Sequence, residues 1–74
     1  MELEVQLFAH LRDGRGKAVF VNVNEGAVVS DVIKALEIEE NMVSNIMIND
    51  SDADFSSTAK EGDCIKLFPP LAGG

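Results

Sequence analysis

The sequence predicts a small α+β domain in which one short helix packs on one face of a mixed β-sheet. Apolar and polar residues alternate in several short segments, which is typical of half-buried strands, while a single segment has helical periodicity. The 74 residues allow one domain. A chain of this length buries only ~60% of its unfolded surface, so we expect no roomy internal active site.

The amino-terminal part contains two strands joined by a turn. Leu3, Val5 and Leu7 alternate with polar residues and indicate the first strand. An Asp-Gly pair within residues 10–17 predicts a hairpin turn. Valines alternate again in the second strand, residues 18–23.

A single amphipathic helix follows these strands. Its apolar stripe is Val29, Val32, Ile33 and Leu36, which fall at i, i+3, i+4 and i+7. Ser30 is the expected N-cap, because its hydroxyl can accept a hydrogen bond from a free N–H of the first turn.

The remaining segments are shorter. Residues 38–44 are expected to form a loop or frayed turn, and residues 45–49 a short buried strand. Residues 50–58 are rich in Asp and Ser, which indicates a surface loop with Phe55 as its anchor. A turn then leads to the last strand, residues 64–68.

These elements fit one topology. If the first strand pairs with both its hairpin partner and the last strand, the result is a β-grasp, or ubiquitin-like, fold. We therefore expect a β-grasp domain over residues 1–68, with a mixed sheet of four to five strands, and a free, flexible C-terminal tail over residues 69–74.

Composition excludes several classes of partner. Thirteen acidic and six basic residues give a net charge of −7, which phosphate backbones and anionic lipids repel. We therefore expect neither nucleic acid nor membrane as a partner.

A single cysteine permits no internal disulfide, and the acidic amino terminus does not resemble a signal peptide. The expected location is the cytoplasm.

The side chains offer little chemistry of their own. One His and one Cys are too few for a zinc or iron–sulfur site, and the Asp-rich run at residues 50–54 lacks the Gly and Glu of a calcium loop. Cys64 shares a strand face with Lys66, which suggests an activated thiolate, although a surface or interface residue is the favoured interpretation. We expect no bound metal, no bound cofactor and no independent active site.

The most informative segment is residues 68–74, which read Phe-Pro-Pro-Leu-Ala-Gly-Gly. Pro69 and Pro70 have a fixed φ and no N–H, so the strand cannot continue and the chain leaves in a stiff, extended form. Gly73 and Gly74 have no side chains, so a narrow tunnel in a partner can admit them. A frayed end without function is the plain alternative.

Three segments together resemble the MoaD-type proteins, the small subunits of molybdopterin synthase. Residues 68–74, preceded by Gly62-Asp63, resemble the ending of that family. Residues 7–12 (Leu-Phe-Ala-His-Leu-Arg) are similar to its first strand and turn, and residues 48–50 (Ile-Asn-Asp) to its central strand and turn. ThiS-type carriers of the thiamine pathway also end in Gly-Gly.

The resemblance implies a sulfur carrier. An E1-like adenylating enzyme would use ATP and magnesium to convert the Gly74 carboxylate into an acyl-adenylate. A sulfur donor protein would then replace AMP and leave a thiocarboxylate. The large subunit of molybdopterin synthase would take up the tail and pass the sulfur to a pterin precursor.

The resemblance also implies a role for each tail residue. Gly74 would carry the sulfur, while Gly73, Ala72 and Leu71 would thread the partner's pocket, with Leu71 as a register stop. An exposed apolar patch for docking on the partner would consist of Phe68, Pro69 and Pro70. Ordinary core packing is the alternative for the Phe68 side chain.

Other functions remain compatible with the sequence. The acceptor could belong to the allied tungsten cofactor, or to another pathway such as that of the thiamine thiazole. The chain could instead be a ubiquitin-like modifier joined through Gly74 to lysines. An interaction module whose tail is only a recognition peptide is the alternative from a different class.

Overall fold

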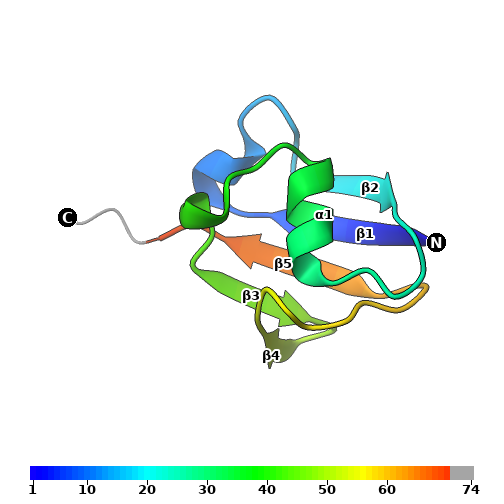
Figure 1. The fold of residues 1–74 in the computed structure, drawn as a ribbon. Helices are drawn as coiled ribbons and strands as arrows, with labels where there is room; N and C mark the ends of the chain where they lie inside the picture. Colours follow the sequence, from blue (N-terminus) through cyan, green and yellow to red (C-terminus); the bar gives the residue numbers. More distant parts are fainter. Residues whose placement is uncertain (71–74) are drawn as a thin grey trace.

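The computed structural model describes residues 1–70 and contains five strands, one α-helix and two 3₁₀ helices (Figure 1). In chain order, the elements are β1 (Glu2–Leu7), η1 (Ala9–Arg12), β2 (Ala18–Asn22), α1 (Val29–Ala35), η2 (Glu40–Met42), β3 (Asn45–Ile48), β4 (Ser51–Ala53) and β5 (Cys64–Phe68).

The sheet has the strand order β2-β1-β5-β3-β4. The two central strands, β1 and β5, are parallel, whereas the three other neighbouring pairs are antiparallel. The first strand thus pairs with both its hairpin partner and the last strand, which confirms the predicted β-grasp topology. Figure 1 shows α1 crossing one face of this sheet.

The core lies between α1 and the sheet face that it covers. Alternate residues of β1 and β5 point into it, and the apolar stripe of α1 meets them from the other side. Burying each large aliphatic side chain contributes about 1.5–3 kcal/mol, so these few residues dominate the stability of the domain. The side chains with no exposed surface are Leu3, Val5, Leu7, Val29, Val32, Ile33, Ile65 and Leu67.

The start of α1 differs from the prediction. The helix begins at Val29 with Val28 at the N-cap, so Ser30 lies inside the first turn. The free N–H groups of Val29 and Ser30 donate to the carbonyl oxygens of Ser57 and Phe55, at 3.0 and 2.9 Å. A tertiary contact with the loop therefore takes the place of a side-chain cap, and the Ser30 hydroxyl hydrogen-bonds to Glu40 instead.

The segment predicted as one surface loop over residues 50–58 contains the short edge strand β4. Asn49 and Asp50 both have positive φ, 51° and 70°, which is the conformation of a tight hairpin turn between β3 and β4. The rest of the segment is a loop, and Phe55 packs against the core as predicted.

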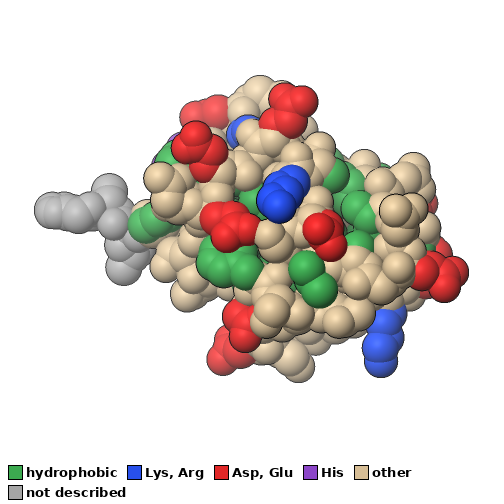
Figure 2. Space-filling model, viewed as in Figure 1, with side chains coloured by type: hydrophobic (Ala, Val, Ile, Leu, Met, Phe, Trp, Pro, Cys, Tyr) green, Lys and Arg blue, Asp and Glu red, His purple; other side chains and the backbone are tan. Residues whose placement is uncertain are grey.

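Acidic side chains outnumber basic ones on the surface of the face that carries α1 (Figure 2). Within residues 1–70, no helix is long and apolar enough to cross a membrane.

Candidate functional site

An aromatic pair marks the end of the two central strands. Leu7 of β1 lies level with Leu67 of β5 in the parallel register, so the residues that follow them lie side by side. The rings of Phe8 and Phe68 stack with their centroids 4.3 Å apart and their planes inclined by 15°. Both side chains are half-buried. The pair therefore forms an apolar surface where the chain leaves β5.

Arg12 contacts the Phe8 ring of this pair and the end of β1. Its guanidinium carbon lies 5.3 Å from the centre of the Phe8 ring, within the range of a cation–π interaction. Its Nε donates a hydrogen bond of 2.7 Å to the carbonyl oxygen of Leu7. Ala9 has a φ of 53° and turns the chain into η1, which returns Arg12 to the end of β1.

A groove of about 530 Å³ opens beside the aromatic pair. The Ser44 N–H donates a hydrogen bond of 2.7 Å to the Phe68 carbonyl oxygen, so the end of β5 is fixed against the segment before β3. Pro69 is half-buried and Pro70 is exposed. We call the groove beside the aromatic pair the tail-root groove. Its lining residues are Phe8, Ala9, His10, Ser44, Asn45, Phe68, Pro69 and Pro70.

The structure thus brings together the three residues predicted to form a docking patch: Phe68, Pro69 and Pro70. The sequence argument missed Phe8 as the stacking partner and Arg12 as its support, although both lie in the segment that resembles the MoaD-type first strand. The parallel pairing of β1 with β5 was the signal that could have identified Phe8. The predicted sulfur-carrying and threading residues, Gly74, Gly73, Ala72 and Leu71, lie outside the described residues.

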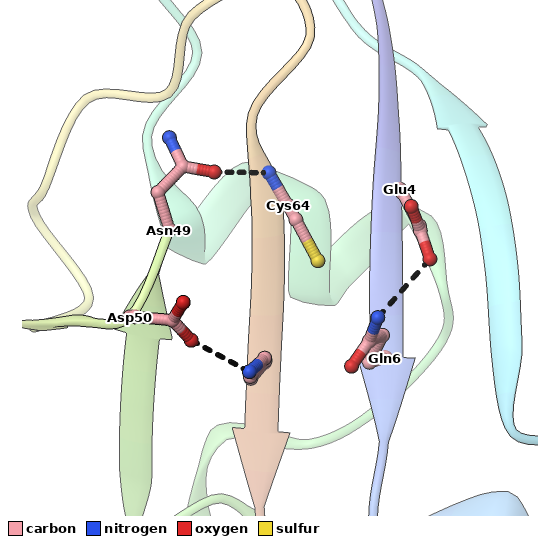
Figure 3. Close-up of polar contacts among 6 residues, drawn as sticks. Glu4, Gln6, Asn49, Asp50 and Cys64 are labelled. Carbon is pink, nitrogen blue, oxygen red and sulfur yellow. Dashed lines mark hydrogen bonds and ion pairs between the residues drawn. The ribbon is translucent and has the colours of Figure 1, made fainter.

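Cys64 lies on the sheet face opposite α1, which we call the open face, between Glu4 of β1 and the end of β3 (Figure 3). Partial burial raises the pKa of its thiol, and the Glu4 carboxylate raises this pKa further. Lys66 lowers the pKa of the thiol, but to a smaller extent. The thiol is therefore not activated, which agrees with the favoured interpretation of Cys64 as a surface residue.

The ammonium group of Lys66 forms an ion pair with Asp50. Its Nζ lies 2.7 Å from a carboxylate oxygen of Asp50, and this hydrogen bond raises the pKa of the ammonium group. Among residues 1–70, no three His, Cys, Asp or Glu side chains gather closely enough to hold a metal ion. The described residues form an apolar surface at the point where the chain leaves the sheet.

Comparison with known proteins places the chain in a family. The model of the ThiS family matches residues 5–74. The chain is 33% identical to small archaeal modifier protein 3 of Haloferax volcanii, and the alignment covers all of both proteins. The crystal structure of SAMP1 from Haloferax volcanii superposes with a TM-score of 0.82, at 28% identity and with both chains fully covered.

A third relative was solved together with a partner. It is found in the complex of subunits 1 and 2 of the molybdopterin-converting factor from Helicobacter pylori, with a TM-score of 0.65, 26% identity and full coverage of both chains. The family match covers nearly the whole sequence, and the β-grasp topology and these relatives agree with it. The chain therefore belongs to the ThiS family of ubiquitin-like sulfur carriers and modifiers.

Proposed function

We propose that this chain is a carrier protein that another enzyme activates at the Gly74 carboxylate. The observation that carries the proposal is the tail-root groove. There β5 delivers the chain through Phe68 and Pro69 to an apolar surface, and Leu71–Gly74 follow these residues in the sequence. The groove supplies a surface for docking, and the terminal residues supply the reacting group.

The proposed chemistry starts from an unreactive group. An ionised C-terminal carboxylate, with a pKa near ~3.5, is a poor electrophile at neutral pH. In an E1-like adenylating enzyme with ATP and magnesium, a Gly74 carboxylate oxygen attacks the α-phosphate and pyrophosphate leaves. Hydrosulfide supplied by a donor protein then attacks the carbonyl carbon of the acyl-adenylate. AMP leaves, and Gly74 ends in a thiocarboxylate.

We further propose that the acceptor is a pterin precursor and that the chain is the small subunit of a molybdopterin synthase, for the molybdenum or tungsten cofactor. The likeness to the Helicobacter pylori protein that was solved with its second subunit supports this assignment. In this proposal, Leu71, Ala72 and Gly73 thread the large subunit, while Phe68 and the two prolines dock on its surface.

A second function has its own support. The relative with 33% identity is named a modifier protein. In a modifier, a lysine amino group rather than sulfur would displace the activating group at Gly74, and the product would be an isopeptide bond. Adenylation at Gly74 is the first step of both functions, so the two candidates differ only in the nucleophile that follows.

An intact-mass measurement separates the candidates. The chain is incubated with the adenylating enzyme of its own organism, ATP, magnesium and a sulfur source. Replacement of one carboxylate oxygen by sulfur supports a carrier, and transfer of that sulfur to a pterin precursor identifies the acceptor. Covalent protein ladders that disappear without Gly74 support the modifier. A persistent lack of either product favours an interaction module.

One variant tests the chemistry of the terminus directly. We predict that one alanine added after Gly74 abolishes charging, because the activated carboxylate is then displaced by one residue along the partner's pocket. The same alanine added before Met1 is the matched control and should leave charging unchanged. Both variants should unfold at the temperature of the unmodified chain. Retained charging of the extended terminus would contradict the proposed function.

A further inference from the structure

The two edges of the sheet differ in how well they are protected from pairing with another chain. At one edge, β4 has only three residues and carries Asp52. At the other edge, β2 has five residues, Ala18–Asn22, none of which is charged, and neither a proline nor a bulge interrupts them. Short length, charge, proline and bulges are the features that prevent edge strands from pairing. Of the two edges, β2 is therefore the one that the fold leaves open to another strand.

The free hydrogen-bonding groups of this edge belong to Ala18, Phe20 and Asn22. The backbone groups of successive residues in a strand point alternately to one neighbour and to the other. The Lys17 carbonyl oxygen accepts a hydrogen bond of 2.9 Å from the Leu7 N–H, so the odd-numbered residues of this segment direct their backbone groups to β1. The even-numbered residues of β2 direct theirs outward. Their side chains are exposed, and the Phe20 ring is 66% exposed.

A second copy of the same strand fits this edge. Two copies related by a two-fold axis normal to the sheet place their edge strands antiparallel. With the axis at Phe20, this residue faces its own copy, and Ala18 of each chain faces Asn22 of the other. This register pairs every outward N–H and C=O group of both strands, in about six hydrogen bonds. A shift of the axis in either direction leaves some of these groups unpaired.

Charges at the two ends of β2 match in the same arrangement. Lys17 lies directly before the strand and Glu25 shortly after it, both are exposed, and neither forms an ion pair with another of residues 1–70. In an antiparallel pair, the beginning of one strand lies beside the end of the other, so each Lys17 approaches the Glu25 of the second copy. The two Glu4 carboxylates are three strand spacings apart, or ~14 Å, beyond the ~8 Å over which charges interact at physiological salt.

We propose that β2 is the interface of a reversible homodimer, in which the β2 strands of two copies pair antiparallel about Phe20 and join the two sheets into one. Strand β5 lies two strands from β2 (Figure 1), so the two Phe68 residues are roughly 35 Å apart, at opposite ends of the joined sheet. The tail-root grooves therefore lie away from the interface, and the pairing does not depend on the chemistry proposed for Gly74. Strands this short cover less than the ~800 Å² per side of a standard interface, so the dimer dissociates on dilution.

Sedimentation equilibrium of the full chain, from about 10 μM to about 1 mM, measures the association. We expect the mass to rise toward that of a dimer with concentration. Phe20→Lys should remain monomeric, because two like charges would then face each other across the pair. Met42→Lys is the matched control, since it also replaces an exposed hydrophobic side chain, 40% exposed, by a lysine, and it should associate like the unmodified chain. A monomer mass at every concentration, or an equal effect of both substitutions, overturns the proposal.

Disulfide trapping tests the register, in a Cys64→Ser background and with copper phenanthroline as the oxidant. Phe20→Cys should form a linked dimer, because directly opposed residues of a hydrogen-bonded pair have Cα atoms ~5.5 Å apart, within the range of a disulfide. Ala18→Cys is the matched control on the same strand and face. It should not link to itself, but it should link to Asn22→Cys when the two proteins are mixed. Equal self-linking of Phe20→Cys and Ala18→Cys indicates random collision and contradicts the pairing. Thermal unfolding followed by circular dichroism verifies that each variant is folded.

Discussion

Removal of the Phe8 ring should destabilise the domain by more than its partial exposure suggests. Phe8→Ala removes about half of the ~1.5–3 kcal/mol that a fully buried Phe contributes. It also removes the stack on Phe68, with centroids 4.3 Å apart, which contributes ~0.5–1.5 kcal/mol. The Arg12 guanidinium 5.3 Å from the ring centre adds ~0.5–1 kcal/mol. We expect a loss of about 2–4 kcal/mol in the free energy of unfolding.

Urea unfolding followed by far-ultraviolet circular dichroism measures this loss, since the chain has neither Trp nor Tyr for fluorescence. Phe20→Ala is the matched control, because its ring is mostly exposed, and it should cost less than about 0.5 kcal/mol. A double-mutant cycle of Phe8→Ala with Phe68→Ala isolates the stack, for which we expect a coupling of ~0.5–1.5 kcal/mol. A coupling below about 0.3 kcal/mol would mean that the two rings act independently, and the reasoning would be refuted.

Two further predictions concern the junction of β3 and β5 and the thiol beside it. The Asn49 side chain donates to Asp63 at 2.8 Å and accepts from the Cys64 N–H at 2.9 Å, so Asn49→Ala should cost ~1–3 kcal/mol in urea unfolding. Asn49→Gly, which tolerates the positive φ of 51°, should cost less than Asn49→Ala; an equal cost would show that backbone conformation plays no part. Burial and the Glu4 carboxylate raise the pKa of the Cys64 thiol, so iodoacetamide should alkylate it more slowly than free cysteine at pH 8, and faster as pH rises. Glu4→Gln should speed alkylation at pH 8, and a slower reaction would contradict the sign of this effect.

Periodicity was sufficient to predict the elements that form the core. Alternation in residues 3–7 and 64–68 predicted β1 and β5, because each strand has one face against α1 and the other in solvent. The edge strand β4 was expected only as an optional fifth strand and was not located in the sequence, because its three residues, Ser51–Ala53, carry no apolar alternation. Its pairing is set instead by the turn at Asn49 and Asp50, which are residue types that tolerate positive φ.

The start of the helix was predicted wrongly for a different reason. Capping preferences assume that the first N–H groups have only local partners, and on that basis Ser30 was the best candidate. In the fold, the loop over residues 55–57 supplies the acceptors by a contact that is distant in the sequence. Such contacts follow from the assembled chain and leave no signature in the helix itself. The Phe8–Phe68 stack also joins residues far apart in the sequence, but it follows from the predicted pairing of the first and last strands once the residues after each strand are considered.

The position of the tail root within the sheet is the feature that ties the fold to the proposed function. β5 is hydrogen-bonded on both sides, to β1 and to β3, and the pairing with β3 continues to Phe68 itself. The Phe8 ring and the Ser44 N–H then fix the side chain and the carbonyl of that last residue. A partner that docks on the tail-root groove therefore meets Pro69 at a position defined by strands that are paired on both sides. Phe8→Ala should then weaken adenylation through KM in folded protein, because the groove loses one of its walls while Gly74 keeps its chemistry.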